Sequence, residues 1–270
     1  MKKIITIMLS IVMILSMVAC GAPKGTDGDA DKKAQTDMEY VKEKGKLVVG
    51  ITEFAPMDYK DADGNWIGFD ADMATAFAEY LGVEVEFVLI DWNNKIMELD
   101  GKSIDCVWNG MTLVDEVLAG MECSEPYCKN AQVVVVRADE ADKYQTEDSV
   151  KDLNFAVEDG GAAQELIEPK GWKCIPVPDQ AQTLMEVSGK TADATVIDLL
   201  MAAAMIGEGT SYEDLTFTVR LNEEEYGVGF RKNSDLAGEL NKFFKEAYAD
   251  GSMMEFAKEY GVSDAIIPQE

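Results

Sequence analysis

Acidic and aromatic side chains follow the ends of several predicted strands. Asp198 stands where a strand over residues 193–197 passes into a helix over 199–206. A carboxylate at such a junction suits an ammonium group in a dry cleft, although it can equally cap the helix. Phe54 lies in a proline-containing loop after another strand, a place that favours ligand contact over core packing, and Glu53 precedes it. Carboxylates beside aromatic rings suit an organic cation.

The stretch 104–118 offers a second kind of binding group. It begins as an apolar strand that runs to Trp108, breaks at the turn dipeptide Asn109-Gly110, and continues as a segment that can open a helix with Thr112 as its N-cap. A strand that stops at a glycine before a helix leaves backbone N–H groups unpaired. Such places hold small polar ligands, and we therefore include Asn109, Gly110 and Thr112 in the predicted site.

The composition excludes several classes of protein. The chain of 270 residues has no histidine, which removes Ser-His and Cys-His catalysis and His-ligated metals. Its formal charge of −27, from 24 basic and 51 acidic side chains, argues against nucleic acid and against an anionic membrane surface as partners. No Gly-x-x-x-x-Gly-Lys-Ser/Thr nucleotide loop occurs, so any ATPase is a separate chain. We predict no metal, no cofactor and no catalytic residue.

The N-terminus has the pattern of an export signal. Lys2 and Lys3 precede an apolar run over residues 4–19 that is too short to span a membrane, for which about 20 residues are needed. Ala19-Cys20-Gly21 resembles a bacterial lipobox, which implies a signal peptide over 1–19 and lipidation of Cys20. The alternatives are an ordinary signal peptide or an uncleaved anchor. We expect residues 20–40 to be the lipidated cysteine and a flexible tether, because they lack an apolar pattern.

Four further cysteines follow Cys20. Cys123 and Cys128 are five residues apart and could pair across a turn, since export permits disulfides. Their spacing suits neither a zinc knuckle nor a redox Cys-x-x-Cys pair. Free buried thiols are the equal alternative for these two and for Cys106 and Cys174.

The order of predicted elements indicates an α/β architecture. Strands at 46–52 and 83–90 alternate with helices at 71–80 and 92–99, and this order implies parallel crossovers. The cluster Asp61-Ala62-Asp63-Gly64 lacks the later glutamate of a calcium loop, so we predict a hairpin turn. Further strands and helices follow from residue 133 onward, and the chain closes with two amphipathic helices.

The chain resembles the bacterial extracellular solute-binding proteins of family 3, the receptors of polar amino-acid ABC transporters. The resemblance covers residues 45–262. Individually the motifs are modest, but as an ordered set they are specific: the loop with Phe54, Pro56 and Tyr59, then Gly68-Phe69-Asp70, Asp91-Trp92, Asp105-x-x-x-x-Gly110-Met111-Thr112, Ser124-Glu125-Pro126-Tyr127 and the strand 131–136.

This resemblance implies a two-lobe, periplasmic-binding-protein-like α/β fold of type II. Each lobe is a mostly parallel sheet flanked by helices, and two crossing strands form a hinge. Lobe 1 comprises residues 41–133 and 226–270, and lobe 2 comprises residues 134–225. The cleft between the lobes closes on the ligand.

The resemblance also assigns roles to site residues. It implies that Phe54 and Trp92 clasp the ligand side chain and that Asp198 pairs with an amino group. Glu158 occupies a position that faces the ligand side chain. Gly161 lies in a loop whose usual hydroxyls are absent here, although its backbone N–H groups remain. Trp108 either lines the cleft or points into the sheet.

One departure from the family pattern bears on the ligand. The position of the arginine that normally holds the ligand carboxylate is Val117, and none of the three arginines, 137, 220 and 231, lies in a site segment. Loss of a charged partner from a buried carboxylate costs about 3–5 kcal/mol. We therefore expect an amine or cationic ligand without a free α-carboxylate. The alternative is an ordinary amino acid whose carboxylate is held by backbone N–H groups.

The expected function is ligand capture for an ABC importer. The partners are a permease and a separate ATPase, and the protein is a monomer, exported and anchored by lipid to the outer face of the cell membrane. Two other functions use the same fold. A ligand-sensing lipoprotein uses the same binding chemistry, and a dehydratase-like enzyme would use Glu158 or Glu53 as a general acid or base.

Overall fold

The computed structural model describes residues 35–270. The predicted signal peptide, Cys20 and residues 20–34 of the predicted tether lie outside the described residues. Helix α1 (Asp37–Lys44) falls partly within the stretch 20–40, which corrects the predicted end of the tether. The Thr36 side chain accepts the Glu39 N–H, and the Glu39 side chain accepts the Thr36 N–H, so a capping box starts the helix. The Thr-x-x-Glu pattern of this capping box is visible in the sequence. Val41 is the buried residue of the helix.

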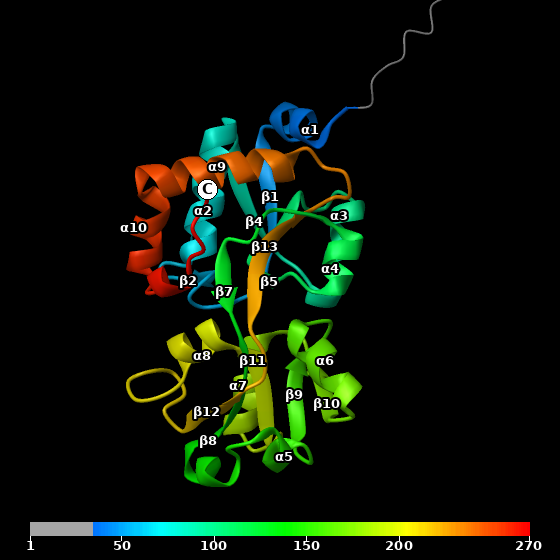
Figure 1. The fold of residues 1–270 in the computed structure, drawn as a ribbon. Coiled ribbons are helices and arrows are strands. Elements are labelled where there is room, and N and C mark those ends of the chain that lie inside the picture. The colour runs from blue at the N-terminus through cyan, green and yellow to red at the C-terminus, as the bar shows by residue number, and fades with distance from the viewer. Residues whose placement is uncertain (1–34) are drawn as a thin grey trace, which may run out of the picture. The chain divides into compact units, whose positions relative to one another are not determined.

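Lobe 1 is built on a six-stranded sheet within the described residues, with strands β4 (Glu84–Leu89), β1 (Lys46–Ile51), β5 (Cys106–Thr112), β13 (Glu224–Phe230) and β6 (Glu122–Cys123) in that order and β7 (Cys128–Asn130) also paired with β13. Strand β1 runs parallel to β4 and β5, whereas β13 runs antiparallel to its neighbours. One face carries α2 (Phe69–Leu81), α9 (Leu236–Asp250) and α10 (Ser252–Glu259), and the other carries α3 (Lys95–Asp100) and α4 (Asp115–Gly120) (Figure 1).

Lobe 2 has a five-stranded sheet in the described chain, in the order β10 (Lys173–Val177), β9 (Asn154–Glu158), β11 (Ala194–Asp198), β8 (Gln132–Arg137) and β12 (Leu215–Arg220). The first three strands are parallel, and β8 is antiparallel to both of its neighbours. The helices of this lobe are α5 (Glu147–Val150), α6 (Ala162–Ile167), α7 (Gln180–Ser188) and α8 (Leu199–Met205). The 3₁₀ turns of the two lobes are η1 (Trp92–Asn94), η2 (Ala138–Lys143), η3 (Glu168–Lys170) and η4 (Ser263–Ala265).

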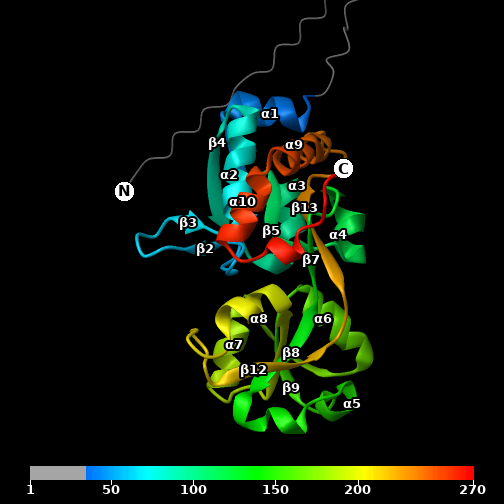
Figure 2. The ribbon, with the colours of Figure 1, turned by 60° about the vertical axis from the view of Figure 1, so that its left-hand side comes forward.

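Two chain segments connect the lobes. The first passes from β7 through Ala131 into β8, and the second returns from β12 into β13 (Figure 2). They run antiparallel and pair side by side, with Asn130 opposite Glu224. The two-lobe α/β fold and the two crossing strands predicted from the sequence are confirmed. A hairpin of β2 (Tyr59–Lys60) and β3 (Trp66–Ile67) projects from lobe 1, with the predicted turn at its tip.

Strand β5 differs from its prediction. It continues through Asn109 and Gly110 to Thr112, and Thr112 is not an N-cap, because α4 begins at Asp115. The physical reason is tertiary: β13 lies alongside and pairs Tyr226 with Thr112, which keeps the strand extended past the glycine. Turn propensity in the dipeptide is therefore overridden by a ladder partner that is distant in the sequence.

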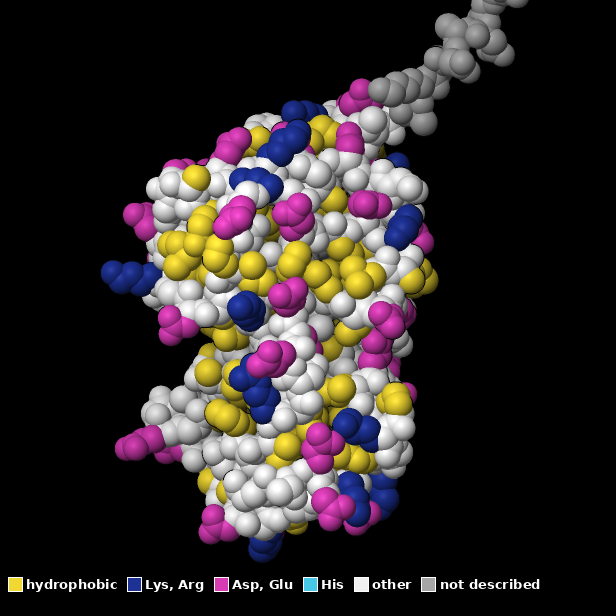
Figure 3. Space-filling model, in the orientation of Figure 1, with side chains coloured by type: hydrophobic (Ala, Val, Ile, Leu, Met, Phe, Trp, Pro, Cys, Tyr) yellow, Lys and Arg dark blue, Asp and Glu magenta, His cyan; other side chains and the backbone are white. Residues whose placement is uncertain are grey.

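The remaining surface and thiol features are simple. Acidic side chains are spread over the visible face of both lobes and form no single patch (Figure 3). Within residues 35–270, Cys106, Cys123, Cys128 and Cys174 form no disulfide, which agrees with the alternative of unpaired cysteines. Burial raises the pKa of Cys123 to about 11, which leaves this thiol unreactive near neutral pH. Within residues 35–270, no helix has the length and apolar character to cross a membrane.

Candidate functional site

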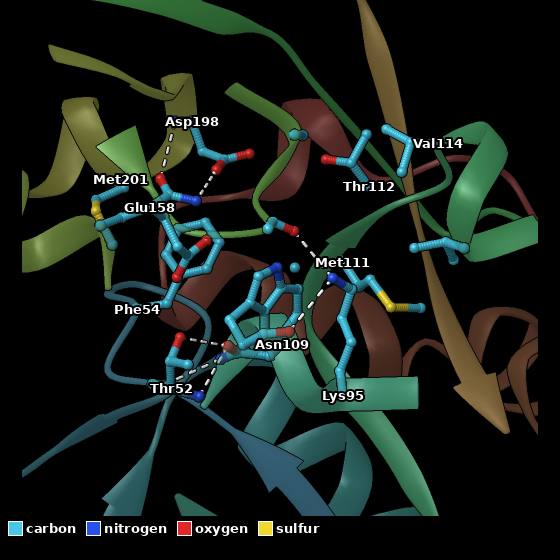
Figure 4. A pocket seen from close by; sticks show the side chains of 16 residues that line it. Thr52, Phe54, Lys95, Asn109, Met111, Thr112, Val114, Glu158, Asp198 and Met201 are labelled. Carbon is cyan, nitrogen blue, oxygen red and sulfur yellow. Dashed lines mark hydrogen bonds between the residues drawn. The ribbon is translucent and has the colours of Figure 1, made fainter. Parts of the chain in front are cut away.

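A cavity lies between the lobes and is lined by side chains of both (Figure 4). From lobe 1 come Phe54, Trp92, Lys95 and the end of β5, and from lobe 2 come Glu158, Gln180, Asp198 and Met201. The space between these side chains is only about 20 Å³, which is enough for about one water molecule. The lobes have thus closed on each other, and an amino acid can enter only if they separate.

The floor of the cavity is held by a network around Asn109. The Asn109 side-chain oxygen accepts from the Thr52 N–H at 2.9 Å and from the Thr52 hydroxyl at 2.7 Å. Its amide donates to the Thr52 carbonyl at 3.1 Å and to Asp58 at 2.7 Å. Asn109 therefore lines the cavity but uses its polar atoms to tie the ends of β1 and β5 together. Beside it, the Gly110 N–H donates to Asp70 at 2.6 Å.

The aromatic ring of Phe54 packs directly against Gly110. Its φ of +53° favours glycine, and a Cβ atom there would lie 2.5 Å from the Phe54 ring. Phe54 is buried and packs edge-to-face on Tyr226, with ring centroids 6.3 Å apart. The glycine that follows Asn109 is thus required for the position of the ring and not for a chain reversal.

Asp198 ends β11 and is almost fully buried. Its carboxylate accepts from Tyr226 at 2.7 Å, from Gln132 at 3.2 Å, and from Asn130 and Gln180. The Asp198 side chain makes no helix-capping bond, although α8 starts immediately after it. Burial, followed by the nearby charge of Glu224, raises the pKa of Asp198 well above its usual range. A buried carboxylate of this kind gains most from a cationic partner.

Glu158 ends β9 and is the second buried carboxylate of the cavity. Burial raises its pKa to about 8, and the positive charge of Lys95 opposes this rise. A Cβ atom on Gly161 would lie 2.9 Å from Glu158 Oε2, so Gly161 provides the room in which this carboxyl group lies. The Gly161 N–H donates to the Glu158 carbonyl at 3.1 Å and is not directed at the cavity.

Lys95 is a cavity residue that the sequence analysis missed. It is the first residue of α3, three positions after Trp92, and its side chain is only 4% exposed. Its Nζ donates to the Trp92 carbonyl at 3.3 Å and, across the lobe boundary, to the Gly160 carbonyl at 2.9 Å. A second interlobe bond joins Asn93 to Asp159 at 3.0 Å. Burial lowers the pKa of Lys95. The only signal in the sequence was its helical spacing from Trp92.

The structure places most, but not all, of the predicted site residues at the cavity. Three of them lie elsewhere. Trp108 points to the opposite face of the sheet, because alternate residues of β5 face opposite sides. There its ring packs on that of Phe244, with ring centroids 5.6 Å apart. Glu53 lines a separate hollow at the outer edge of the lobe boundary. Gly161 is behind Glu158. Those that line the cavity are Phe54, Trp92, Asn109, Gly110, Thr112, Glu158 and Asp198.

The polar groups near Thr112 and the arginines are also engaged elsewhere. The Thr112 hydroxyl donates to Glu224 at 2.9 Å. Val117, the position where the family pattern has arginine, is buried and lines the cavity. No arginine of the described chain lines it, and Arg231 is buried in lobe 1 with Asp37 and Asp105. The site segments of the sequence contain no arginine, and no arginine of the described residues reaches the cavity from elsewhere in the fold.

Two α/β lobes joined by paired crossing strands, with a closed polar cavity between them, define a ligand-binding protein of the two-lobe type. The chain belongs to the bacterial extracellular solute-binding proteins, family 3, whose family model matches residues 47–263. This confirms the resemblance on which the sequence analysis relied.

Individual relatives are similar along most of their length. The arginine-binding extracellular protein ArtP of Bacillus subtilis (strain 168) is 26% identical over 269 residues, with coverage of 96% of this chain and 98% of that protein. A mutant of ArgBP from T. maritima superimposes with a TM-score of 0.78 at 28% identity, covering 83% and 99% of the two chains. A substrate-binding protein of an ABC uptake transporter from Streptococcus pneumoniae, with bound histidine, gives a TM-score of 0.78 at 26% identity, covering 86% and 99%. These relatives are binding proteins and not enzymes, in agreement with the prediction of no catalytic activity.

Proposed function

We propose that this protein captures a small ligand of net positive charge outside the cell and delivers it to an ABC importer. The observation that carries this proposal is the charge of the cavity. Two buried carboxylates, Glu158 and Asp198, line it, and among the described residues that line it only Lys95 carries a positive charge. A cationic ligand gives these two carboxyl groups a partner and favours their ionised form, which burial otherwise disfavours. Relatives named as arginine-binding support the same class of ligand.

Each group of the cavity binds a different part of the ligand. Asp198 binds an ammonium group, because its carboxylate is fixed by neighbouring donors and forms no ion pair in the part of the chain that the structure describes. Glu158 binds a second cationic group. The rings of Phe54 and Trp92 cover the apolar part and add a cation–π contribution. A ligand with two separated positive groups, such as a basic amino acid or a diamine, uses all four residues.

Two versions of this ligand remain, and they differ in the carboxylate. The missing arginine favours an amine that has none. The alternative of a carboxylate held by backbone N–H groups loses support at the glycine loop, because the Gly160 N–H donates to Gln164 at 2.7 Å and the Gly161 N–H is also occupied. The buried ammonium of Lys95, which lines the same cavity, favours the version with a carboxylate.

The remaining parts of the proposal concern location and movement. We place the protein on the outer face of the cell membrane, attached by lipid at Cys20 after removal of residues 1–19, with a permease and a separate ATPase as partners. Lobe 1 (41–133 and 226–270) and lobe 2 (134–225) separate about the two crossing segments to admit the ligand. The bonds from Lys95 and Asn93 to the glycine loop break in that opening.

A melting-temperature screen of the domain over residues 35–270 tests the proposal. The panel contains arginine, lysine, histidine, agmatine, cadaverine and choline, with glutamate, glutamine and cystine as neutral or acidic comparisons. A ligand at 100 times its dissociation constant stabilises the protein by about 2.7 kcal/mol, which is easily measured. We expect cationic compounds to raise the melting temperature and glutamate to have no effect.

Two variants separate the site from nonspecific effects of charge. Asp198→Asn removes the proposed ammonium partner and should abolish the shift. Glu53→Gln removes a nearby carboxylate that lies outside the cavity and should leave the shift unchanged. A shift caused only by neutral or acidic compounds, or one that persists in Asp198→Asn, contradicts the proposal.

A further inference from the structure

Lys95 carries a buried positive charge that forms no ion pair within residues 35–270, although Glu116, Glu158, Glu165 and Asp159 act on it through their charges. Its Nζ contacts two carbonyl oxygens, those of Trp92 and Gly160, and it forms no ion pair with any carboxylate in the described residues. An ammonium group has three N–H donors, so one of them remains without an acceptor. Removing a charge from water without a counter-ion in direct contact is costly, and burial accordingly lowers the pKa of Lys95. The site is therefore incomplete in a way that an anionic group would correct.

The position of Lys95 directs this charge into the cavity. Residue 95 opens α3 at the lobe boundary, and its side chain runs along the cavity wall near Met111, while Asp198 lies on the other side of the same cavity (Figure 4). The aliphatic stem of the lysine packs beside Trp92, with Nζ 5.2 Å from the ring centroid. The cation is thus held by packing and by two hydrogen bonds, one of them to the other lobe.

The other candidates for an anion-binding group are already engaged. The N–H groups of Gly160 and Gly161 have partners, and the Thr112 hydroxyl donates to Glu224. The two carboxyl groups of the cavity, Glu158 and Asp198, offer an anion no positive charge. Among the described residues that line the cavity, Lys95 is therefore the group best able to receive a negative charge.

We propose that Lys95 binds the carboxylate of the ligand and thereby selects amino acids over the corresponding amines. This inference rests on the proposed function, since it concerns the same cavity. The ligand is a basic amino acid: its α-amino group lies at Asp198, its carboxylate at Lys95, and its side-chain cation near Glu158. The bond from Lys95 to Gly160 then couples the bound carboxylate to lobe closure.

The test compares each basic amino acid with its decarboxylated amine. Arginine and agmatine, and lysine and cadaverine, are titrated calorimetrically into the wild-type protein and into Lys95→Gln, which keeps an N–H donor for the carbonyl oxygens but loses the charge. A charge-assisted hydrogen bond of about 1.5–3 kcal/mol corresponds to a preference of roughly 10- to 100-fold for the amino acid. We expect this preference in the wild type and its loss in Lys95→Gln. Lys95→Arg should retain part of it.

The readout separates carboxylate binding from a purely structural role. If Lys95 only holds the lobes together, Lys95→Gln weakens the amino acid and the amine equally, and the ratio of their affinities is unchanged. That result overturns the inference, as does a wild-type protein that binds the amine as tightly as the amino acid. In both cases the proposed function stands. If none of the four compounds binds, the proposed function fails together with the inference.

Discussion

Binding of a cationic ligand should release a proton from Glu158. In the closed cavity burial raises the pKa of this carboxyl group to about 8, from an ordinary value of 4.5. At about 1.36 kcal/mol per pH unit, ionising Glu158 inside that cavity costs about 5 kcal/mol. At pH 7 a group with a pKa of about 8 is about 90% protonated. A ligand that forms an ion pair with the carboxylate must displace this proton.

The sign of the pH dependence follows from the same difference. A pKa that is raised in the closed, empty state means that this state binds the proton more tightly than the open state does. The stabilisation of the closed, empty state by the proton is complete below about pH 4.5 and is lost as the pH rises through about 8. Protons and cationic ligands therefore compete for Glu158, and affinity for the ligand should rise with pH up to about 8.

Calorimetry in two buffers of different ionisation enthalpy measures the released protons directly. At pH 7 the wild type should release more protons per bound ligand than Glu158→Gln, up to about 0.9 where the lobes are closed before binding, since the glutamine cannot titrate. Asp198 is present in both proteins, so its own contribution cancels in the comparison. Glu53→Gln is the matched control, because Glu53 lies outside the cavity, and it should behave as the wild type. Equal proton release by the wild type and Glu158→Gln would refute the reasoning.

Three further predictions concern the lobe 1 side of the site. Burial raises the pKa of Asp70 to about 7. The free energy of unfolding that the Asp70 proton contributes is therefore complete below about pH 3.8 and falls by up to about 4 kcal/mol as the pH rises to 7. Urea unfolding of the wild type should show this loss of stability, and Asp70→Asn should not. Gly110→Ala should weaken ligand binding at least about tenfold by displacing Phe54, whereas Gly64→Ala, which has a positive φ but open space around it, should not change affinity in the same titration. Trp108→Phe should lower the free energy of unfolding by about 1–3 kcal/mol and leave affinity unchanged, since its ring packs in the core; a weakened affinity would return Trp108 to the cavity.

Much of the fold could be predicted because its signals are local. Asp179 is a residue type that caps helices and precedes a helical pattern, and its side chain accepts the Gln182 N–H at the start of α7. Gly82 directly follows a helical pattern, and it adopts the left-handed conformation that ends α2. Capping and termination depend on neighbouring residues in the chain, so the sequence carries them directly. The order of these elements was then sufficient to identify two α/β lobes.

The error at β5 has a physical cause that no local pattern contains. Asn109-Gly110 has the composition of a turn, but Tyr226 of β13 pairs with Thr112 and extends the strand. The same pairing sets which residues of β5 face the cavity, and it sends the ring of Trp108 to the opposite face. Strand register depends on a partner more than 100 residues away, and a single strand read alone does not reveal it.

The sequence by itself determined the class of the protein and the residue types of its site: the two-lobe order of elements, the aromatic ring of Phe54, the carboxylates of Glu158 and Asp198, and the absence of an arginine at Val117. Only the tertiary structure decided the charge balance of the cavity. Lys95 lies on a short helix of lobe 1 and meets the glycine loop of lobe 2 only when the lobes close. In an extended chain water would hydrate this ammonium group. Once it is buried, it needs a partner inside the cavity instead.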